Sequence, residues 1–198
     1  GIDEKPVLNK FNKIEPIEKY NVKTMSIGFM IGEQKPIIWR GPMLQKALEQ
    51  LINDVNWGEL DILIIDMPPG TGDVHLTITQ KLKLSGAIII TTPQDLALVD
   101  AIKGLNMYKK VNVPILGMIE NMSSFICSNC LHEHHIFGKN RAIKMAKKLG
   151  TPLLGKIPIT EEISERSDSG IPITQSEPEN KASKVYFTLA NKIMEKIC

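Results

Sequence analysis

The stretch that decides the fold is DILIIDMPPGTGDVHLT, residues 61–77. Apolar residues Leu63 to Ile65 run into Asp66, and a loop of proline, glycine, threonine and aspartate follows. An uninterrupted apolar run is typical of a strand buried on both faces of a parallel sheet, and ligands bind beyond the carboxyl ends of such strands. The stretch therefore predicts a strand over 61–66 that delivers a carboxylate to a magnesium-phosphate site.

The loop after this strand adds further candidate contacts. Gly70 and Gly72 would let backbone N–H groups approach a terminal phosphate, and Asp73 would either cap the next helix, 74–82, or position a water. We interpret His75 as a residue on the surface of that helix. An acid after an apolar run is common, but the full string DMPPGTGD is rare, which favours a nucleotide site over a simple turn.

Strand and helix patterns alternate along the rest of the chain. This alternation, with strands that are continuous apolar runs, predicts a doubly wound α/β fold: a mostly parallel sheet with helices on both faces, in a single domain over 1–198. The predicted helices are 43–55, 74–82, 95–110, 140–150 and 180–197, and the predicted strands are 22–30, 61–66, 86–92, 113–121 and 152–158.

Composition excludes several classes of protein. The net charge is only +2 over 198 residues and no basic stripe accompanies it, which argues against nucleic acid and acidic membrane surfaces as partners. No apolar stretch approaches the length of a membrane span. Three cysteines in a chain of this length do not make a disulfide framework, and they suit a reducing compartment.

A magnesium-phosphate site normally has a second half, a loop of the form GxxxxGK[ST]. The segment GTPLLGKI, residues 150–157, nearly fits, but Ile157 replaces the hydroxyl residue and the loop interior is apolar. The segment also follows a helix, whereas a phosphate loop follows a strand. We therefore interpret it as a helix stop followed by a strand, and expect the first strand, the phosphate loop and its helix to lie upstream of Gly1.

The cysteine pair indicates metal chemistry. Cys127 and Cys130 form a CxxC unit, which supplies two of the four ligands that an iron–sulfur cluster usually takes. A two-fold dimer would supply the other two. Zinc bound within one chain by both cysteines and two of His132, His134 and His135 is the second interpretation. A redox dithiol is the third, because no helix N-terminus follows to acidify Cys127.

Several stretches, in this order, carry a resemblance: MSIGFMIG, WRGPM, DVNWGELDILIIDMPPGTGDVHLT, TTPQDLALVDA, VPILGMIENMS, CSNC followed by HIFG, and IPI followed by SDSGIPI. Over nearly the whole chain they resemble the Mrp/ApbC iron–sulfur carrier ATPases, which include mitochondrial nucleotide-binding-protein-like members. These are deviant P-loop ATPases related to MinD and ParA. The resemblance implies a homodimer that binds ATP with Mg²⁺ and holds a labile 4Fe–4S cluster across the dimer for delivery to apo iron–sulfur proteins.

The resemblance also implies roles for individual residues. Asp66 is the magnesium-side acid of a switch loop over 67–73, and Asp73 is a second catalytic candidate. Asn121 resembles an adenine-contacting asparagine, and Pro158 lies near the base. The cluster ligands are the two cysteines. The full set of nucleotide-contact candidates is Pro69, Gly70, Thr71, Gly72, Asn121 and Pro158.

One departure from the family is large. Members begin with a GKGGVGKST-type loop, which this sequence lacks, so we expect residues 1–198 alone to bind and hydrolyse ATP poorly. A missing central strand would also leave an unpaired edge and exposed apolar surface. The main alternative function is a zinc-binding, non-enzymatic interaction module. A partitioning ATPase of the MinD/ParA type shares the fold but has no reason to carry CxxC. The expected compartment is the cytoplasm, with the mitochondrial matrix as the alternative.

Overall fold

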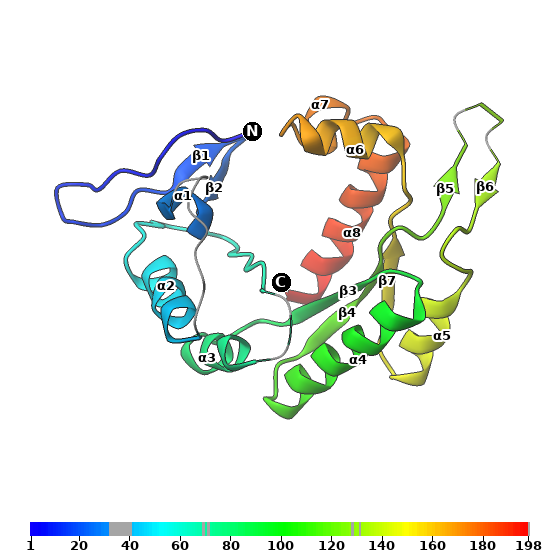
Figure 1. The fold of residues 1–198 in the computed structure, drawn as a ribbon, viewed down its shortest axis with the longest axis horizontal. Coiled ribbons are helices and arrows are strands. Elements are labelled where there is room, and N and C mark those ends of the chain that lie inside the picture. The colour runs from blue at the N-terminus through cyan, green and yellow to red at the C-terminus, as the bar shows by residue number, and fades with distance from the viewer. Residues whose placement is uncertain (32–40, 69, 71, 128, 131, 198) are drawn as a thin grey trace. The chain divides into compact units, whose positions relative to one another are not determined.

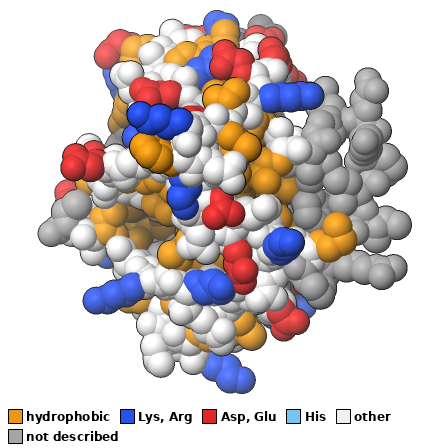
Figure 2. Space-filling view, turned by 90° about the vertical axis from the view of Figure 1, so that its left-hand side faces the viewer, with side chains coloured by type: hydrophobic (Ala, Val, Ile, Leu, Met, Phe, Trp, Pro, Cys, Tyr) orange, Lys and Arg blue, Asp and Glu red, His pale blue; other side chains and the backbone are white. Residues whose placement is uncertain are grey.

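The computed structural model describes residues 1–31, 41–68, 70, 72–127, 129–130 and 132–197. The chain forms two compact units, 1–81 and 82–198 (Figure 1). On the face drawn in Figure 2, acidic and basic side chains are interspersed instead of gathering by sign. That distribution agrees with the small net charge of the sequence.

The second unit is built on a parallel sheet with strand order β3-β4-β7 (Figure 1). Its strands are β3 (Ala87–Thr91), β4 (Ile115–Glu120) and β7 (Leu153–Lys156). The register pairs Thr91 with Glu120 and Glu120 with Lys156, so all three strands end at one edge. The sequence-based prediction of a parallel α/β fold is confirmed in this unit.

Helices cover both faces of this sheet (Figure 1). They are α4 (Asp95–Lys110) and α5 (Arg141–Lys148) on one face and α8 (Lys181–Ile197) on the other. Met118 packs in the cluster on the α4 side, while its neighbour Ile119 packs with Leu189 of α8. Successive strand residues point to opposite faces, so a continuous apolar strand serves two cores at once.

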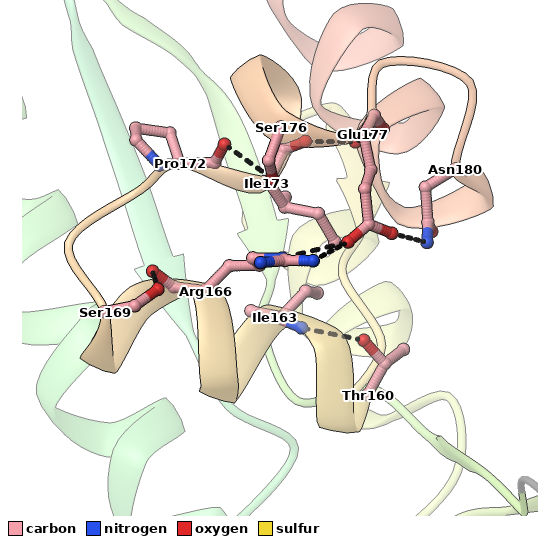
Figure 3. Close-up of polar contacts among 10 residues, drawn as sticks. Thr160, Ile163, Arg166, Ser169, Pro172, Ile173, Ser176, Glu177 and Asn180 are labelled. Carbon is pink, nitrogen blue, oxygen red and sulfur yellow. Dashed lines mark hydrogen bonds and ion pairs between the residues drawn. The ribbon is translucent and has the colours of Figure 1, made fainter.

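Short elements fill the remainder of the second unit: β5 (Phe125–Ile126), β6 (Glu133–His134), α6 (Glu161–Asp168) and α7 (Ile173–Ser176). The α6–α7–α8 junction is held by a polar network (Figure 3). Arg166 donates to Glu177 Oε1 from Nε at 2.9 Å, and Nη2 lies 2.8 Å from the same oxygen. Asn180 donates to Glu177 Oε2 at 3.0 Å and accepts from the Ala182 N–H at 2.9 Å, which links the network to the start of α8.

The first unit combines a hairpin with helices. The elements are β1 (Ile17–Lys19), β2 (Val22–Thr24), α1 (Ile27–Ile31), α2 (Gly41–Asn53) and α3 (Asp73–Lys81). β1 and β2 are antiparallel. Helices α2 and α3 contact each other and share an ion pair of 2.8 Å between Glu49 and Lys81.

The five predicted helices are confirmed as α2, α3, α4, α5 and α8 within a few residues of the expected ends. Gly150 follows α5 with φ +63°, the left-handed conformation of a helix stop, and the strand β7 comes next. The interpretation of 150–157 as a stop and a strand is therefore confirmed. The predicted strand 22–30 is only partly right, because Ser26 Oγ accepts the Gly28 N–H at 3.1 Å and a short helix begins there.

The predicted strand over 61–66 is wrong: residues 62–68 adopt no regular structure. Apolar side chains of this stretch are exposed, Ile64 at 87%. A strand needs a neighbour to take its backbone N–H and C=O groups, and no described residue pairs with this stretch. Strand propensity alone therefore does not create a strand here.

A close approach inside the sheet of the second unit gives a test of its packing. A methyl group on Gly117 would lie 2.5 Å from Leu154 Cγ and 2.9 Å from the Pro152 carbonyl oxygen. We expect Gly117→Ala to lower the free energy of unfolding by about 1–3 kcal/mol, measured by urea denaturation. Gly104→Ala, in α4 with open space at the added methyl group, should raise it by about 0.5–1 kcal/mol. Equal effects from the two variants would contradict this packing.

Candidate functional site

The predicted switch loop lies in the first unit, between the irregular stretch and α3. Asp66, Gly70 and Gly72 are exposed, and Gly70 has φ +102°, a conformation that favours glycine. Helix α3 begins at Asp73, whose position in the first turn places a carboxylate near the positive end of the helix. Two further predicted contacts, Pro69 and Thr71, lie outside the described residues.

His75 corrects one sequence-based interpretation. Its side chain is 5% exposed, so it is a buried residue of α3 and not a surface one. It lies on the same helix as Ile78, which is 0% exposed, and the first helical turn closes through the His75 N–H to the Gly72 carbonyl at 3.0 Å. Burial lowers the pKa of His75, because the charged imidazolium is disfavoured away from water.

The structure brings Asn121 and Pro158 to one edge of the second unit's sheet. Asn121 directly follows β4, and its N–H donates to the Thr91 carbonyl at 2.7 Å. One residue, Ile157, separates Pro158 from the end of β7, and the Ile157 N–H donates to the Glu120 carbonyl at 2.8 Å. These bonds continue the sheet past its ends. The adenine-contact role of both residues stays a prediction.

Glu120 is a polar residue at this edge that sequence reasoning missed. Its side chain is 1% exposed although it ends an otherwise apolar strand. Oε2 accepts the Ala142 N–H at 3.1 Å, in the first turn of α5, and Oε1 lies 3.3 Å from Lys156 Nζ. Glu120 shows the same sequence pattern as Asp66, an acid at the end of an apolar run, and that pattern could have identified it.

The two cysteines lie in the loop of the β5–β6 hairpin, which extends away from the sheet (Figure 1). Phe125 pairs with His134, and the Cys127 N–H donates to the His132 carbonyl at 3.0 Å, which closes the loop. Both thiols are free, with Cys127 half-buried and Cys130 exposed. The hairpin therefore presents two adjacent thiols at its tip.

The loop geometry favours a thiolate at Cys127. The backbone N–H of Cys130, the backbone N–H of Asn129 and the Cys130 thiol lower the pKa of Cys127, against smaller opposing effects from partial burial and from the negative charge of Glu161. Hydrogen bonds to sulfur favour its charged form, and thiolates are the ligands of soft metals and clusters. The sequence argument looked only for a helix N-terminus and missed this source of acidity.

The histidines of the hairpin do not complete a metal site with the cysteines. The rings of His132 and His134 contact each other in a T-shaped arrangement, with centroids 4.6 Å apart. Among the residues that the structure describes, which include both cysteines and all three loop histidines, no three His, Cys, Asp or Glu side chains come together to hold a metal.

The fold is that of the MinD-like P-loop NTPases, and the second unit carries a cysteine hairpin in addition. The nucleotide-binding protein of Archaeoglobus fulgidus, solved with ADP, has a TM-score of 0.72 at 32% identity, over 90% of this chain and 68% of that one. The cell division ATPase MinD of Pyrococcus furiosus has a TM-score of 0.55 at 25% identity, over 77% and 57%.

The chain belongs to the ParA family of NUBPL iron-transfer P-loop NTPases, whose profile matches residues 1–194. It is 49% identical to the iron-sulfur cluster transfer protein NUBPL of Dictyostelium discoideum, over 98% of this chain and 60% of that protein. It is 46% identical to the iron-sulfur cluster carrier protein of Aquifex aeolicus, over 97% and 53%. The chain thus spans little more than half the length of these relatives.

A plant relative is similar over the same span. A mitochondrial iron-sulfur protein of Arabidopsis thaliana, required for NADH dehydrogenase, is 48% identical over 98% of this chain and 62% of that protein. Among the described residues, no helix has the length and apolar character needed to cross a bilayer.

The acidity of Cys127 can be tested by alkylation. We expect the iodoacetamide reaction of Cys127 to reach half its maximal rate at a lower pH than that of an unstructured cysteine peptide, because the reactive thiolate is stabilised. Glu161→Gln should move that midpoint lower still, since the Glu161 charge raises the pKa of Cys127. Glu162→Gln, the adjacent acid in α6, serves as the matched control and should leave it in place. A peptide-like midpoint would contradict the proposed loop geometry.

Proposed function

We propose that this protein is an ATP-dependent carrier that binds a 4Fe–4S cluster as cargo and transfers it to apo iron–sulfur proteins. The observation that carries the proposal is the hairpin tip, where two free thiols lie side by side, one half-buried and one exposed. Family membership and the names of the relatives support it. A reducing compartment, the cytoplasm or the mitochondrial matrix, suits two free thiols.

The cargo site requires two copies of the chain. Each hairpin offers Cys127 and Cys130, and a 4Fe–4S cluster takes four thiolates, so a two-fold homodimer would complete the set. Apolar side chains near the hairpin are exposed: Met122 at 43%, Ile126 at 39% and Ile136 at 60%. A second copy would cover such residues, which supports a contact between hairpins in the dimer.

The nucleotide part of the proposal assigns ATP and Mg²⁺ to the sequence-predicted residues. Asp66 would hold the ion, Asp73 would position the attacking water, and Gly70 and Gly72 would let the backbone approach the phosphates. Asn121 and Pro158 would contact the base at the end of the second unit's sheet, as the predicted adenine contacts.

We further propose that residues outside this chain supply the phosphate loop and a strand. Two observations support an added strand: among the described strands β3 pairs only with β4, with Ile90 61% exposed, and the apolar run that contains Ile64 pairs with no described residue. An apolar strand would satisfy backbone groups that have no partner among the described residues. In the complete site, the γ-phosphate and Mg²⁺ would order the switch loop, and hydrolysis would release it and change the packing of the dimer around the cluster.

Anaerobic reconstitution tests the cargo site. The full-length protein, incubated with ferrous iron and sulfide, should take up about four irons per dimer. Cys127→Ser should abolish uptake because one thiolate per chain is lost, whereas Cys198→Ser should have no effect. The measurement is iron and sulfide content together with the mass of the assembly. One zinc per monomer, retained without dimerisation, would contradict the proposal.

Mutation of Asp66 tests the nucleotide site. In the full-length protein we expect Asp66→Asn to lower kcat for ATP hydrolysis by about a hundredfold, because the charge that holds the ion beside the phosphates is removed. Asp61→Asn, an exposed acid five residues earlier, is the matched control and should retain wild-type hydrolysis. Steady-state phosphate release at saturating magnesium measures both. Equal rates for the two variants would remove Asp66 from the site.

A further inference from the structure

The segment that carries the cysteines leaves the sheet and returns to it at nearly the same place. It departs after Glu120, the last residue of β4, and it rejoins the core at Asn140, which stands at the N-terminus of α5. Asn140 has φ +61°, so the chain turns sharply there. Residues 121–140 are therefore an excursion with both ends at one corner of the sheet.

The outgoing limb of this excursion is fixed by backbone bonds to the segment after β7. Ser123 donates to the Ile157 carbonyl from its N–H at 3.0 Å and from its buried hydroxyl at 3.1 Å. The Ile159 N–H donates to the Ser124 carbonyl at 2.7 Å. These bonds extend the parallel pairing beyond Glu120 and hold the first half of the hairpin in place.

The returning limb pairs with the outgoing limb through β6, and its base is tied by side chains, with Lys156 central to them. Its Nζ lies 3.3 Å from Glu120 Oε1, at the start of the excursion, and donates to Asn140 Oδ1, at its end, also at 3.3 Å. The positive charge of Lys156 also acts on Glu133, within β6, whose pKa is lowered first by a hydrogen bond from Ser124. One ammonium group thus contacts the residue just before the excursion and the residue at its end.

Glu120 completes the arrangement from the buried side. Its other carboxylate oxygen accepts the Ala142 N–H at 3.1 Å, in the first turn of α5, just after the returning limb ends. A carboxylate that is 1% exposed is costly unless it is paired and hydrogen-bonded, and here the partners are the Ala142 N–H of α5, just past the end of the excursion, and Lys156 of β7.

We propose that Glu120 and Lys156 are positioning residues that close the base of the cysteine hairpin and so set the orientation of its thiols. This inference rests on the proposed function for its consequence, the retention of a cluster, but its geometry belongs to the apo chain. Without the pair, the outgoing limb would keep its backbone bonds, while the base of the returning limb, between β6 and α5, would move. Two hairpins with variable tips would meet less often in the geometry that four thiolates need.

The test uses the full-length protein and Lys156→Met. In the apo state we expect amide hydrogen exchange of Cys127 to become about tenfold faster, which corresponds to about 1.4 kcal/mol of lost local protection. Met118, whose N–H donates to the Pro152 carbonyl in the sheet, should keep its protection. In the reconstituted dimer, loss of the cluster to a ferrous chelator should also be about tenfold faster.

Three further variants separate positioning from general stability. Lys156→Arg retains the charge and should restore slow exchange at the hairpin. The double variant Glu120→Gln with Lys156→Met leaves no buried unpaired charge. It should therefore be more stable toward urea than Lys156→Met alone, while the amide exchange of Cys127 should stay fast. Lys184→Met removes a lysine from an exposed ion pair with Glu179 in the same unit and should behave as wild type.

The outcomes are distinguishable. Exchange that stays slow at Cys127 in Lys156→Met, or that rises equally at Met118, would overturn the positioning role. Faster exchange confined to the hairpin would support it even in a protein that takes up no cluster, a result that would overturn the proposed function alone. Faster exchange with an unchanged rate of cluster loss would overturn the link between hairpin orientation and retention.

Discussion

The parallel pairing of β4 with both of its neighbours is the constraint on which the second unit depends. Because the three strands run in one direction, their last residues, Thr91, Glu120 and Lys156, arrive side by side at one edge. Each feature of functional interest in this unit starts from that edge. Asn121 and the cysteine hairpin continue from β4, and Pro158 continues from β7. The close passage of Gly117 beside Leu154 is what lets the two strands approach in this register.

A buried carboxylate at such an edge has consequences beyond its own solvation. Glu120 needs a donor and a cation, and the chain supplies the Ala142 N–H from α5 and the ammonium of Lys156 from β7. The groups that satisfy Glu120 therefore join three elements that are distant in sequence. A neutral apolar residue would pack equally well in the core but would leave the return of the chain into α5 without this tie.

The sequence predicts those elements whose pattern lies within one segment, and it fails where the structure depends on a partner that is distant in the sequence. The helices α4 and α8 are long and amphipathic, so their apolar period was sufficient to find them. The stretch 61–66 failed because a strand is a property of a pair, and apolar residues carry no information about whether a partner is present. The two-residue strands of the hairpin are too short to show a period. Cys127 and Cys130 were therefore predicted as ligands from their residue type, but their position in the loop of a hairpin was not predicted. Glu120 was missed because burial of an acid depends on Lys156, 36 residues away.

In the proposed carrier role the chain would have to hold a cluster firmly and still release it, and the two ends of the hairpin differ in ways that suit these two demands. Its base is joined to a parallel sheet by backbone bonds through Ser123 and Ser124 and by the charge of Lys156. Its tip places the Cys127 sulfur against backbone N–H groups that stabilise the thiolate, while Cys130 stays exposed. Hydrogen bonds to a ligating sulfur reduce its donation to iron, and exposure gives an acceptor protein access. A fixed base with two accessible thiols, one of them hydrogen-bonded by backbone N–H groups, would suit the retention and release of a cluster in the proposed role.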